Sequence, residues 1–278
     1  MRRPRPRRCE PAHSTSWGGG FTLVTIGPIG TWLVLTEAST LAEVCVLPYA
    51  WALRPVGAQP RRFQWKLNAV ILIILRGQVV FGAAAALGLF LGPRVGLGAR
   101  PIGLAELVQS AAAGIAVAVA ILLLETSVFR AARRSIRAAA LAKPPLWASL
   151  LTVLYGGIAE EVLMRFGLQT ALCAGLNYAL AGGAGTVTGS VMWAAIALSA
   201  LAFGAGHLPA MRGLVPLTGA VVIRTVILNS LGGLLFGWLY WKHGIVAAMA
   251  AHTAADFTLR GVSGVRSGWI ARRSSPVG

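Results

Sequence analysis

The chain has 278 residues, of which 56% are hydrophobic and 12% are charged, and its mean hydropathy is +0.71. Soluble domains carry about 25% charged residues, so this composition excludes an ordinary soluble protein and a disordered one. The net charge of +17 would suggest nucleic acid as the partner of a soluble protein. Here the basic residues lie between apolar runs, as in loops beside anionic lipid. We expect an integral membrane protein that contacts the lipid bilayer and no nucleic acid.

Residues 1–20 are basic and rich in Pro and Gly, which predicts a disordered tail. A membrane-spanning helix needs about 20 apolar residues, and candidates cover residues 21–53, 67–91, 102–129, 146–172, 187–208, 214–241 and 244–259. The first run is too long for one simple crossing, so a tilted helix with an interfacial start and a pair of short segments both stay open. The predicted fold is all-α, a polytopic transmembrane bundle of six to eight helices.

The segments that connect the apolar runs differ in charge. Residues 54–66, residues 130–143 and the C-terminal residues from Arg260 onward are basic, whereas residues 173–186 carry no charge. Basic loops stay in the cytoplasm, which predicts a cytoplasmic C-terminus. A single first crossing would place the basic N-terminal tail on the opposite side, and a double crossing would remove that conflict. The Arg-rich, Lys-poor composition suggests a bacterial plasma membrane.

Ionisable residues are concentrated in the late apolar runs. A charged side chain at the centre of a membrane helix costs about 2.5–3.5 kcal/mol on insertion scales, so such residues mark function and must find partners. There are six of them, in three runs: Glu160, Glu161 and Arg165, then His207, then His252 and Asp256. We expect these groups to meet inside the bilayer.

Helical spacing predicts how they pair. Glu161 and Arg165 are four residues apart with the acid first, so they can form an ion pair on one helix face. Glu160 is rotated by about 100° from Glu161, which leaves its carboxylate freer and makes it the candidate base.

The two histidines also have partners on their own helices. Asp256 lies four residues after His252 and can accept one ring N–H, which would fix the orientation of that imidazole. Phe203 lies four residues before His207 and is expected to pack over the site.

The residues form three motifs in order: EEVLMR at 160–165, FGAGH at 203–207 and HTAAD at 252–256. Together they resemble the CAAX-protease and bacteriocin-processing (CPBP, or Abi) family of intramembrane endopeptidases, which includes type II CAAX prenyl endopeptidases. The resemblance covers residues 145–260, the expected catalytic core. Residues 21–144 are then N-terminal transmembrane helices and residues 261–278 a basic cytoplasmic tail.

The resemblance implies hydrolysis of a peptide bond in the membrane, in a peptide or membrane-protein substrate such as a prenylated or bacteriocin-type peptide. Glu160 and His207 would activate a water, and His252 with Asp256 would stabilise the oxyanion. Glu161 and Arg165 would support the first carboxylate. The last motif position is commonly Asn in the family, and Asp256 departs from this. We expect His252 to be an imidazolium beside Asp256.

Three alternatives remain open from the sequence. The first is a metallo-endopeptidase in which Glu160, His207 and His252 bind zinc, although the glutamate-type reaction requires no cofactor and HExxH is absent. The second is a transporter or ion pathway that uses the same polar cluster as a proton relay. The third is a membrane scaffold or immunity protein without catalytic activity.

Overall fold

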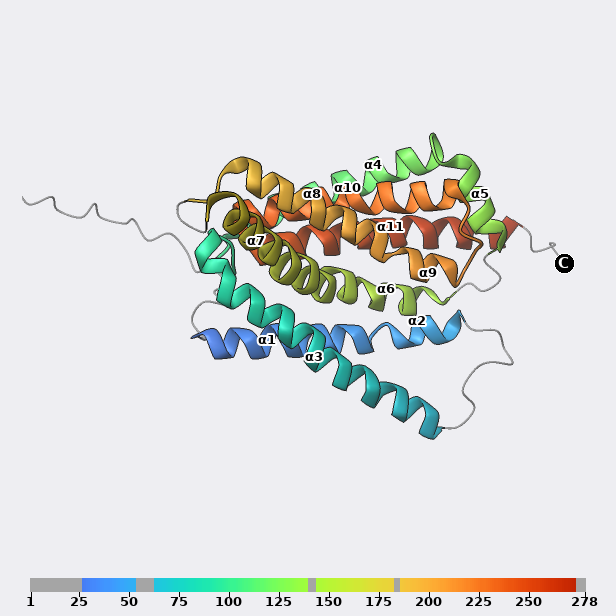
Figure 1. Ribbon diagram of the computed structural model, residues 1–278. Helices are drawn as coiled ribbons and strands as arrows, with labels where there is room; N and C mark the ends of the chain where they lie inside the picture. The colour runs from blue at the N-terminus through green and yellow to red at the C-terminus, as the bar shows by residue number, and fades with distance from the viewer. Residues whose placement is uncertain (1–26, 54–62, 140–143, 183–185, 274–278) are drawn as a thin grey trace, which may run out of the picture.

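The computed structural model describes residues 27–53, 63–139, 144–182 and 186–273, and in these ranges the chain forms helices and no strand. The long helices run side by side along one axis (Figure 1). Within these described ranges, six helical runs are long and apolar enough to cross a membrane. They are Gly27–Ala52, Leu67–Val95, Leu104–Thr126, Leu146–Leu180, Gly189–Arg212 and Gly219–His243. The predicted all-α polytopic bundle is therefore confirmed, and the protein is an integral membrane protein.

The N-terminal helices resolve the question about residues 21–53. Helices α1 (Gly27–Val44) and α2 (Leu47–Ala52) follow one another in one candidate crossing, interrupted only by a turn at residues 45–46. A double crossing in this segment is therefore wrong. Helix α3 (Phe63–Val95) returns along α1, and Arg76 on α3 pairs with the buried Glu43 on α1. The basic residues of the N-terminal tail lie outside the described residues.

Helices α4 (Leu104–Thr126) and α5 (Arg130–Ala139) differ sharply in character. Helix α4 is a membrane span, whereas α5 is short, basic and turned across the end of the bundle (Figure 1). The apolar side of α5 packs through Ala132 against Val215 and Val221. An amphipathic basic helix in this position is typical of a segment that lies in the membrane interface.

The fourth crossing contains a change in helix type. It begins as α6 (Leu146–Leu154), continues through two π-helical segments, Tyr155–Glu160 and Val162–Gln169, and ends as α7 (Thr170–Ala181). A π-helix has hydrogen bonds from residue i to i+5 and is frequently found at functional sites. The chain remains helical through Gly156 and Gly157, so the crossing has no break at these glycines.

The last helices complete the bundle around α11. Helices α8 (Gly189–Gly206), α9 (Leu208–Arg212) and α10 (Gly219–His243) lead into α11 (Ile245–Arg273). Helix α11 packs most extensively against α4 and also contacts α10, α6 and the first π-helical segment. It continues beyond residue 260, where the sequence analysis placed the start of a basic tail.

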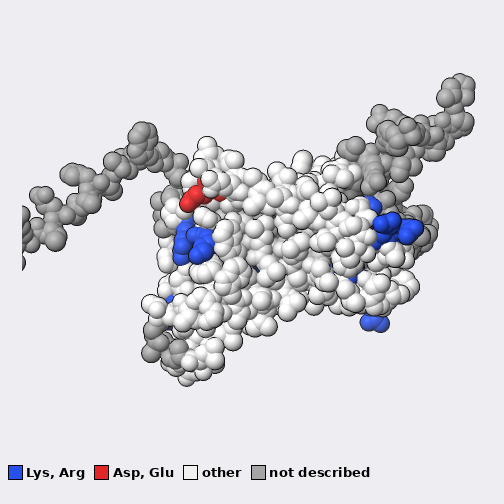
Figure 2. Space-filling model, turned by 90° about the horizontal axis from the view of Figure 1, so that it is seen from above, with Lys and Arg blue, Asp and Glu red and all other residues white. Residues whose placement is uncertain are grey.

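The segments that connect the long helices can be grouped by the end of the bundle at which they lie. In Figure 1, the ends of α2 and α11, the starts of α3 and α6, and helices α5 and α9 all lie at one end. Exposed Arg130, Arg134 and Arg212 belong to this end. Seen from above, basic side chains gather at both ends of the molecule and the surface between them is almost free of charge (Figure 2). This apolar belt is the surface expected against lipid.

Candidate active site

A cavity of about 710 Å³ opens among the helices near the end that carries α2, α5 and α9. Its lining includes residues from α2, the first π-helical segment, α8, α9, α10 and α11. Five of the residues predicted from the motifs line it: Glu160, Phe203, His207, His252 and Asp256. The structure thus brings together groups that lie almost 100 residues apart in the chain.

Glu160 lies between the two imidazoles. Its Oε1 is 4.0 Å from Nε2 of His207, and its Oε2 is 3.8 Å from Nε2 of His252. The Glu160 side chain keeps 19% of its surface exposed toward the cavity. These separations are too long for direct hydrogen bonds, so the carboxylate faces both rings across a gap.

The π-helical segment and two glycines make this convergence possible. A Cβ added at Gly156 would lie 2.9 Å from Asp256 Oδ2 and 3.2 Å from His252 Nε2. A Cβ added at Gly157 would lie 2.0 Å from Thr253 Oγ1. Helix α11 therefore approaches the backbone before Glu160 more closely than any side chain would allow.

Glu161 has a different environment from Glu160. It is fully buried, its Oε1 lies 2.8 Å from Nδ1 of His252, and its Oε2 lies 3.3 Å from Nε of Arg165. The predicted ion pair between Glu161 and Arg165 is present. The predicted orientation of His252 by Asp256 is wrong, because Asp256 Oδ1 is 4.0 Å from Nε2 and Glu161 makes the short contact instead.

Arg165 anchors this buried pair to α8. The guanidinium is fully buried and donates from Nη1 to Ser199 Oγ at 3.0 Å. Ser199 Oγ in turn donates to the carbonyl oxygen of Met164 at 2.9 Å. Since a buried ion pair needs further hydrogen bonds to offset its desolvation, Ser199 is a structural partner that the motifs did not reveal.

His207 lies just beyond the end of α8, where its imidazole is fixed by the helix backbone. Nδ1 is 2.8 Å from the carbonyl oxygen of Phe203. A carbonyl only accepts hydrogen bonds, so Nδ1 carries the hydrogen, and in the neutral ring Nε2 is an acceptor. Nε2 is the ring nitrogen that faces Glu160.

Aromatic rings enclose the imidazoles. Phe203 meets His207 edge-on with ring centroids 4.7 Å apart and meets His252 at 5.6 Å. Phe236 of α10 stacks on His252 at 4.5 Å with an interplanar angle of 18°. The predicted packing of Phe203 is observed. Phe236 was missed, because nothing in the sequence of α10 distinguishes it from an ordinary core residue.

The arginine that lines the cavity is Arg260, not the buried Arg165. Arg260 donates from Nη2 to Asp256 Oδ2 at 3.3 Å and lines the same cavity. Arg260 was expected among the C-terminal basic residues, although its i,i+4 spacing from Asp256 is a signal that could have identified its pairing with Asp256.

The zinc alternative can be tested against these positions. Ligands at about 2.0–2.2 Å around a tetrahedral zinc ion lie about 3.3 Å from one another. The Glu160 carboxylate is farther than this from both imidazoles, and within the described ranges no group of three or more His, Cys, Asp or Glu could hold a metal ion. The residues as placed do not fit zinc, so no step below involves a metal.

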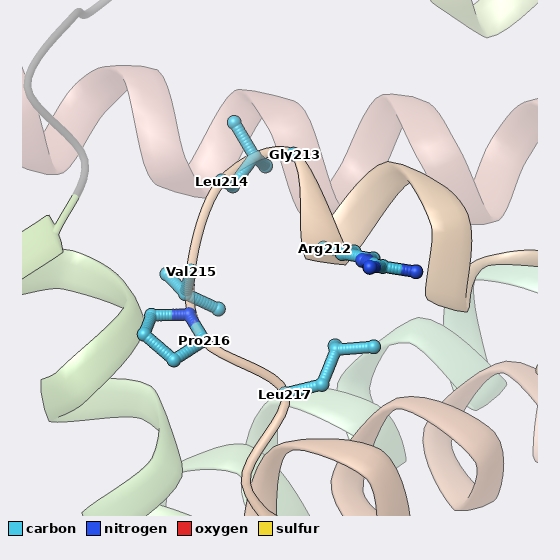
Figure 3. Close-up of a pocket in the computed structure, with 6 residues that line it drawn as sticks. All are labelled: Arg212, Gly213, Leu214, Val215, Pro216 and Leu217. Atoms are coloured by element: carbon cyan, nitrogen blue, oxygen red, sulfur yellow. The ribbon is translucent and has the colours of Figure 1, made fainter.

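A second hollow lies at the loop between α9 and α10. It is lined by Arg212, Gly213, Leu214, Val215, Pro216 and Leu217. Arg212 is its only ionisable side chain, and the others are apolar or lack a side chain (Figure 3). Without an acid, a base or a nucleophile, this hollow does not compete with the Glu160 cavity as an active site.

The fold and the cavity define a polytopic helical membrane protein with a carboxylate and two imidazoles facing each other between its helices. Residues 142–258 match the family described as type II CAAX prenyl endopeptidase Rce1-like. This match supports the assignment of this part of the chain to the CAAX protease (CPBP) family that the motifs predicted. At the family level, this supports an intramembrane endopeptidase. The chain matches no curated protein and no solved structure.

The glycine contact gives a first testable prediction. Gly157→Ala places a methyl group against Thr253 and is expected to displace α11 and to lower activity by about tenfold or more, because small misplacements of reacting groups are costly. A second substitution, Thr253→Ala, removes the nearest atom and leaves Cβ at 3.1 Å, so the double variant should recover part of the activity. Gly175→Ala, with no atom within 4 Å of the added Cβ, is the matched control. Equal activities of the two single glycine variants would contradict this role of Gly157.

Proposed function

We propose that this protein is an intramembrane endopeptidase in which Glu160 and His207 activate a water molecule. The observation that carries the proposal is the position of the Glu160 carboxylate, 4.0 Å and 3.8 Å from the Nε2 atoms of His207 and His252, at the wall of a cavity. One water bonded to two acceptors at about 2.8 Å each spans about 4–4.5 Å between them. The gap between Glu160 and His207 suits such a water.

The first chemical step is proposed as follows. The water donates one hydrogen bond to Glu160 and one to Nε2 of His207, and its oxygen attacks the carbonyl carbon of the substrate. A C–O bond forms while one proton moves from the water to the Glu160 carboxylate. Glu160 is suited to this because it faces the cavity and no arginine is paired with it among the described residues.

The developing oxyanion is assigned to His252. Nδ1 of His252 donates to the buried Glu161, so donation from Nε2 requires the imidazolium form. The nearby carboxylates of Glu160, Glu161 and Asp256 favour the imidazolium form of His252, because opposite charges nearby favour a charged group. In the second step, the C–N bond breaks and Glu160 returns its proton to the leaving amine, which regenerates the carboxylate.

The substrate and the orientation follow from the cavity and the charges. Most of the cavity wall is apolar and includes Val46, Leu53, Ile121, Leu228 and Leu259, which suits an apolar peptide segment or a membrane protein. The cavity lies near the end of the bundle that carries α5 and α9, where Arg130, Arg134 and Arg212 are exposed. By the positive-inside rule, we assign that end and the C-terminus to the cytoplasm of a bacterial cell.

His207 gives the test of this proposal. The full chain in liposomes is incubated with a mixture of fluorogenic peptides rich in apolar residues, and cleavage is followed by fluorescence and mass spectrometry. We expect cleavage by the wild-type protein and a loss of about 10²–10⁴-fold in His207→Gln, as for removal of a positioned acid–base group. The control is His243→Gln, at the other end of α10, where Nδ1 of His243 is 3.6 Å from Glu106. Absence of cleavage by the wild-type protein, or equal activity of both variants, would contradict the proposal.

A further inference from the structure

Asp256 lies between a histidine and an arginine, and each of its oxygens faces a different one. Oδ1 is 4.0 Å from Nε2 of His252, and Oδ2 is 3.3 Å from Nη2 of Arg260. Asp256 and Arg260 are partly buried, with side-chain exposures of 18% and 29%, so water screens their pairing less than it screens a surface pair.

The charges in the site divide into pairs once Arg260 is included. Glu161 is paired with Arg165, and Asp256 is paired with Arg260. Glu160 is left facing the two imidazoles. Arg260 therefore supplies the counter-charge that Asp256 needs.

The Arg260 guanidinium lies beside an aromatic ring of α2. Its Cζ lies 5.9 Å from the centroid of the Tyr49 ring on α2, and its Nε is buried without a hydrogen-bond partner in the described part of the chain. Both Arg260 and Tyr49 line the cavity. Arg260 thus links the catalytic face of α11 to the short helix α2, which forms one wall of the cavity.

Without Arg260, the Asp256 carboxylate would compete with the substrate oxyanion for the hydrogen on Nε2 of His252. The gap of 4.0 Å between Oδ1 and Nε2 of His252 could close to a hydrogen bond of about 2.8 Å with a small rotation of the side chain. Nε2 would then donate to Asp256 and be unavailable to the substrate.

We infer that Arg260 is a positioning residue that restrains Asp256, so that Nε2 of His252 stays available to the substrate. This inference rests on the proposed function. Arg260 lies outside the three motifs. Its role is in the chemical step, and it acts only through Asp256. Binding of the substrate in the ground state does not depend on it.

A double-mutant cycle tests this role. The full chain in liposomes is compared as wild type, Arg260→Gln, Asp256→Asn and the double variant, with kcat and KM measured on the peptide that the wild type cleaves best. We expect Arg260→Gln to lower kcat about 5- to 100-fold, the range typical of coupled neighbours, with KM changed by less than about threefold. With Asn at position 256 no charge needs restraint, so adding Arg260→Gln should change kcat by less than about twofold.

Controls separate this role from others. Arg134→Gln removes one exposed positive charge at the same end of the bundle and should leave kcat unchanged, whereas Arg260→Lys should retain most of the activity. An equal loss on removing Arg260 with Asp or Asn at position 256 would overturn the inference, and so would a loss confined to KM. If Glu160→Gln is as active as the wild type, the proposed function itself fails, whatever the outcome at Arg260.

Discussion

Glu160→Gln is expected to abolish peptide hydrolysis while the protein still folds and accumulates in the membrane. The amide has almost the shape of the carboxylate but cannot take a proton from water, so the loss should be at least about 10²–10⁴-fold. Because Glu160 lines a cavity and keeps 19% of its side chain exposed, the substitution leaves no buried charge unpaired. Initial rates in liposomes, normalised to the amount of folded protein, give the measurement.

The control for Glu160 is a second carboxylate in a membrane helix. Glu37 on α1 accepts a hydrogen bond from Gln78 at 3.1 Å and does not line the cavity. Glu37→Gln should therefore retain wild-type activity. A Glu160→Gln variant that stays within about threefold of the wild type would contradict its role as the base, since loss of an acid–base group costs far more.

Arg165→Met is expected to give the largest loss of stability. The substitution leaves the fully buried Glu161 without its arginine partner and removes the hydrogen bond to Ser199. Breaking a buried ion pair by removing one partner costs about 3–5 kcal/mol. Reversible unfolding in mixed micelles, monitored by circular dichroism, measures the change in the free energy of unfolding.

A double substitution distinguishes the ion pair from simple packing. In Glu161→Gln/Arg165→Met neither partner is charged, so the loss of stability should be smaller than in Arg165→Met alone. The activity should remain low, because Glu161 also holds Nδ1 of His252 at 2.8 Å. A change of less than about 1 kcal/mol in Arg165→Met would contradict the structural role of the pair, since that is within the range of exposed pairs.

Glu160 and Glu161 illustrate how neighbouring identical residues acquire different roles. Glu161 is fully buried, paired with Arg165 and bonded to His252. Glu160 is rotated toward the cavity and bonded to neither imidazole. Burial and pairing make the first a fixed anion that orients the site, and the gap around the second leaves room for a water.

The parts of the site that depend on contacts within one helix were predicted from the sequence. The spacing of Glu161 and Arg165 gave their ion pair, and the spacing of Phe203 and His207 gave their ring contact. The apolar runs likewise predicted the membrane-spanning helices, because 20 apolar residues have few alternatives to crossing the bilayer.

Contacts between helices could not be predicted in this way. The sequence assigned His252 to Asp256 on its own helix, whereas the structure gives the short contact to Glu161 on another helix. The close approach at Gly157 depends on π-helical geometry and on the packing of α11. Neither of these contacts leaves a periodic pattern in the sequence, because tertiary packing decides which helices pair.

Solid-state NMR in liposomes can detect whether Glu160 and both imidazoles converge in one cavity. The protein is labelled with ¹³C at Glu carboxyl groups and with ¹⁵N at His side chains, and carbon–nitrogen dipolar couplings are measured in the wild type and in Glu160→Gln. We expect a coupling at Nε2 of His207 that disappears in the variant, because Nε2 lies 4.0 Å from Oε1 of Glu160. A wild-type protein with no coupling between any Glu carboxyl and His207 would contradict this convergence.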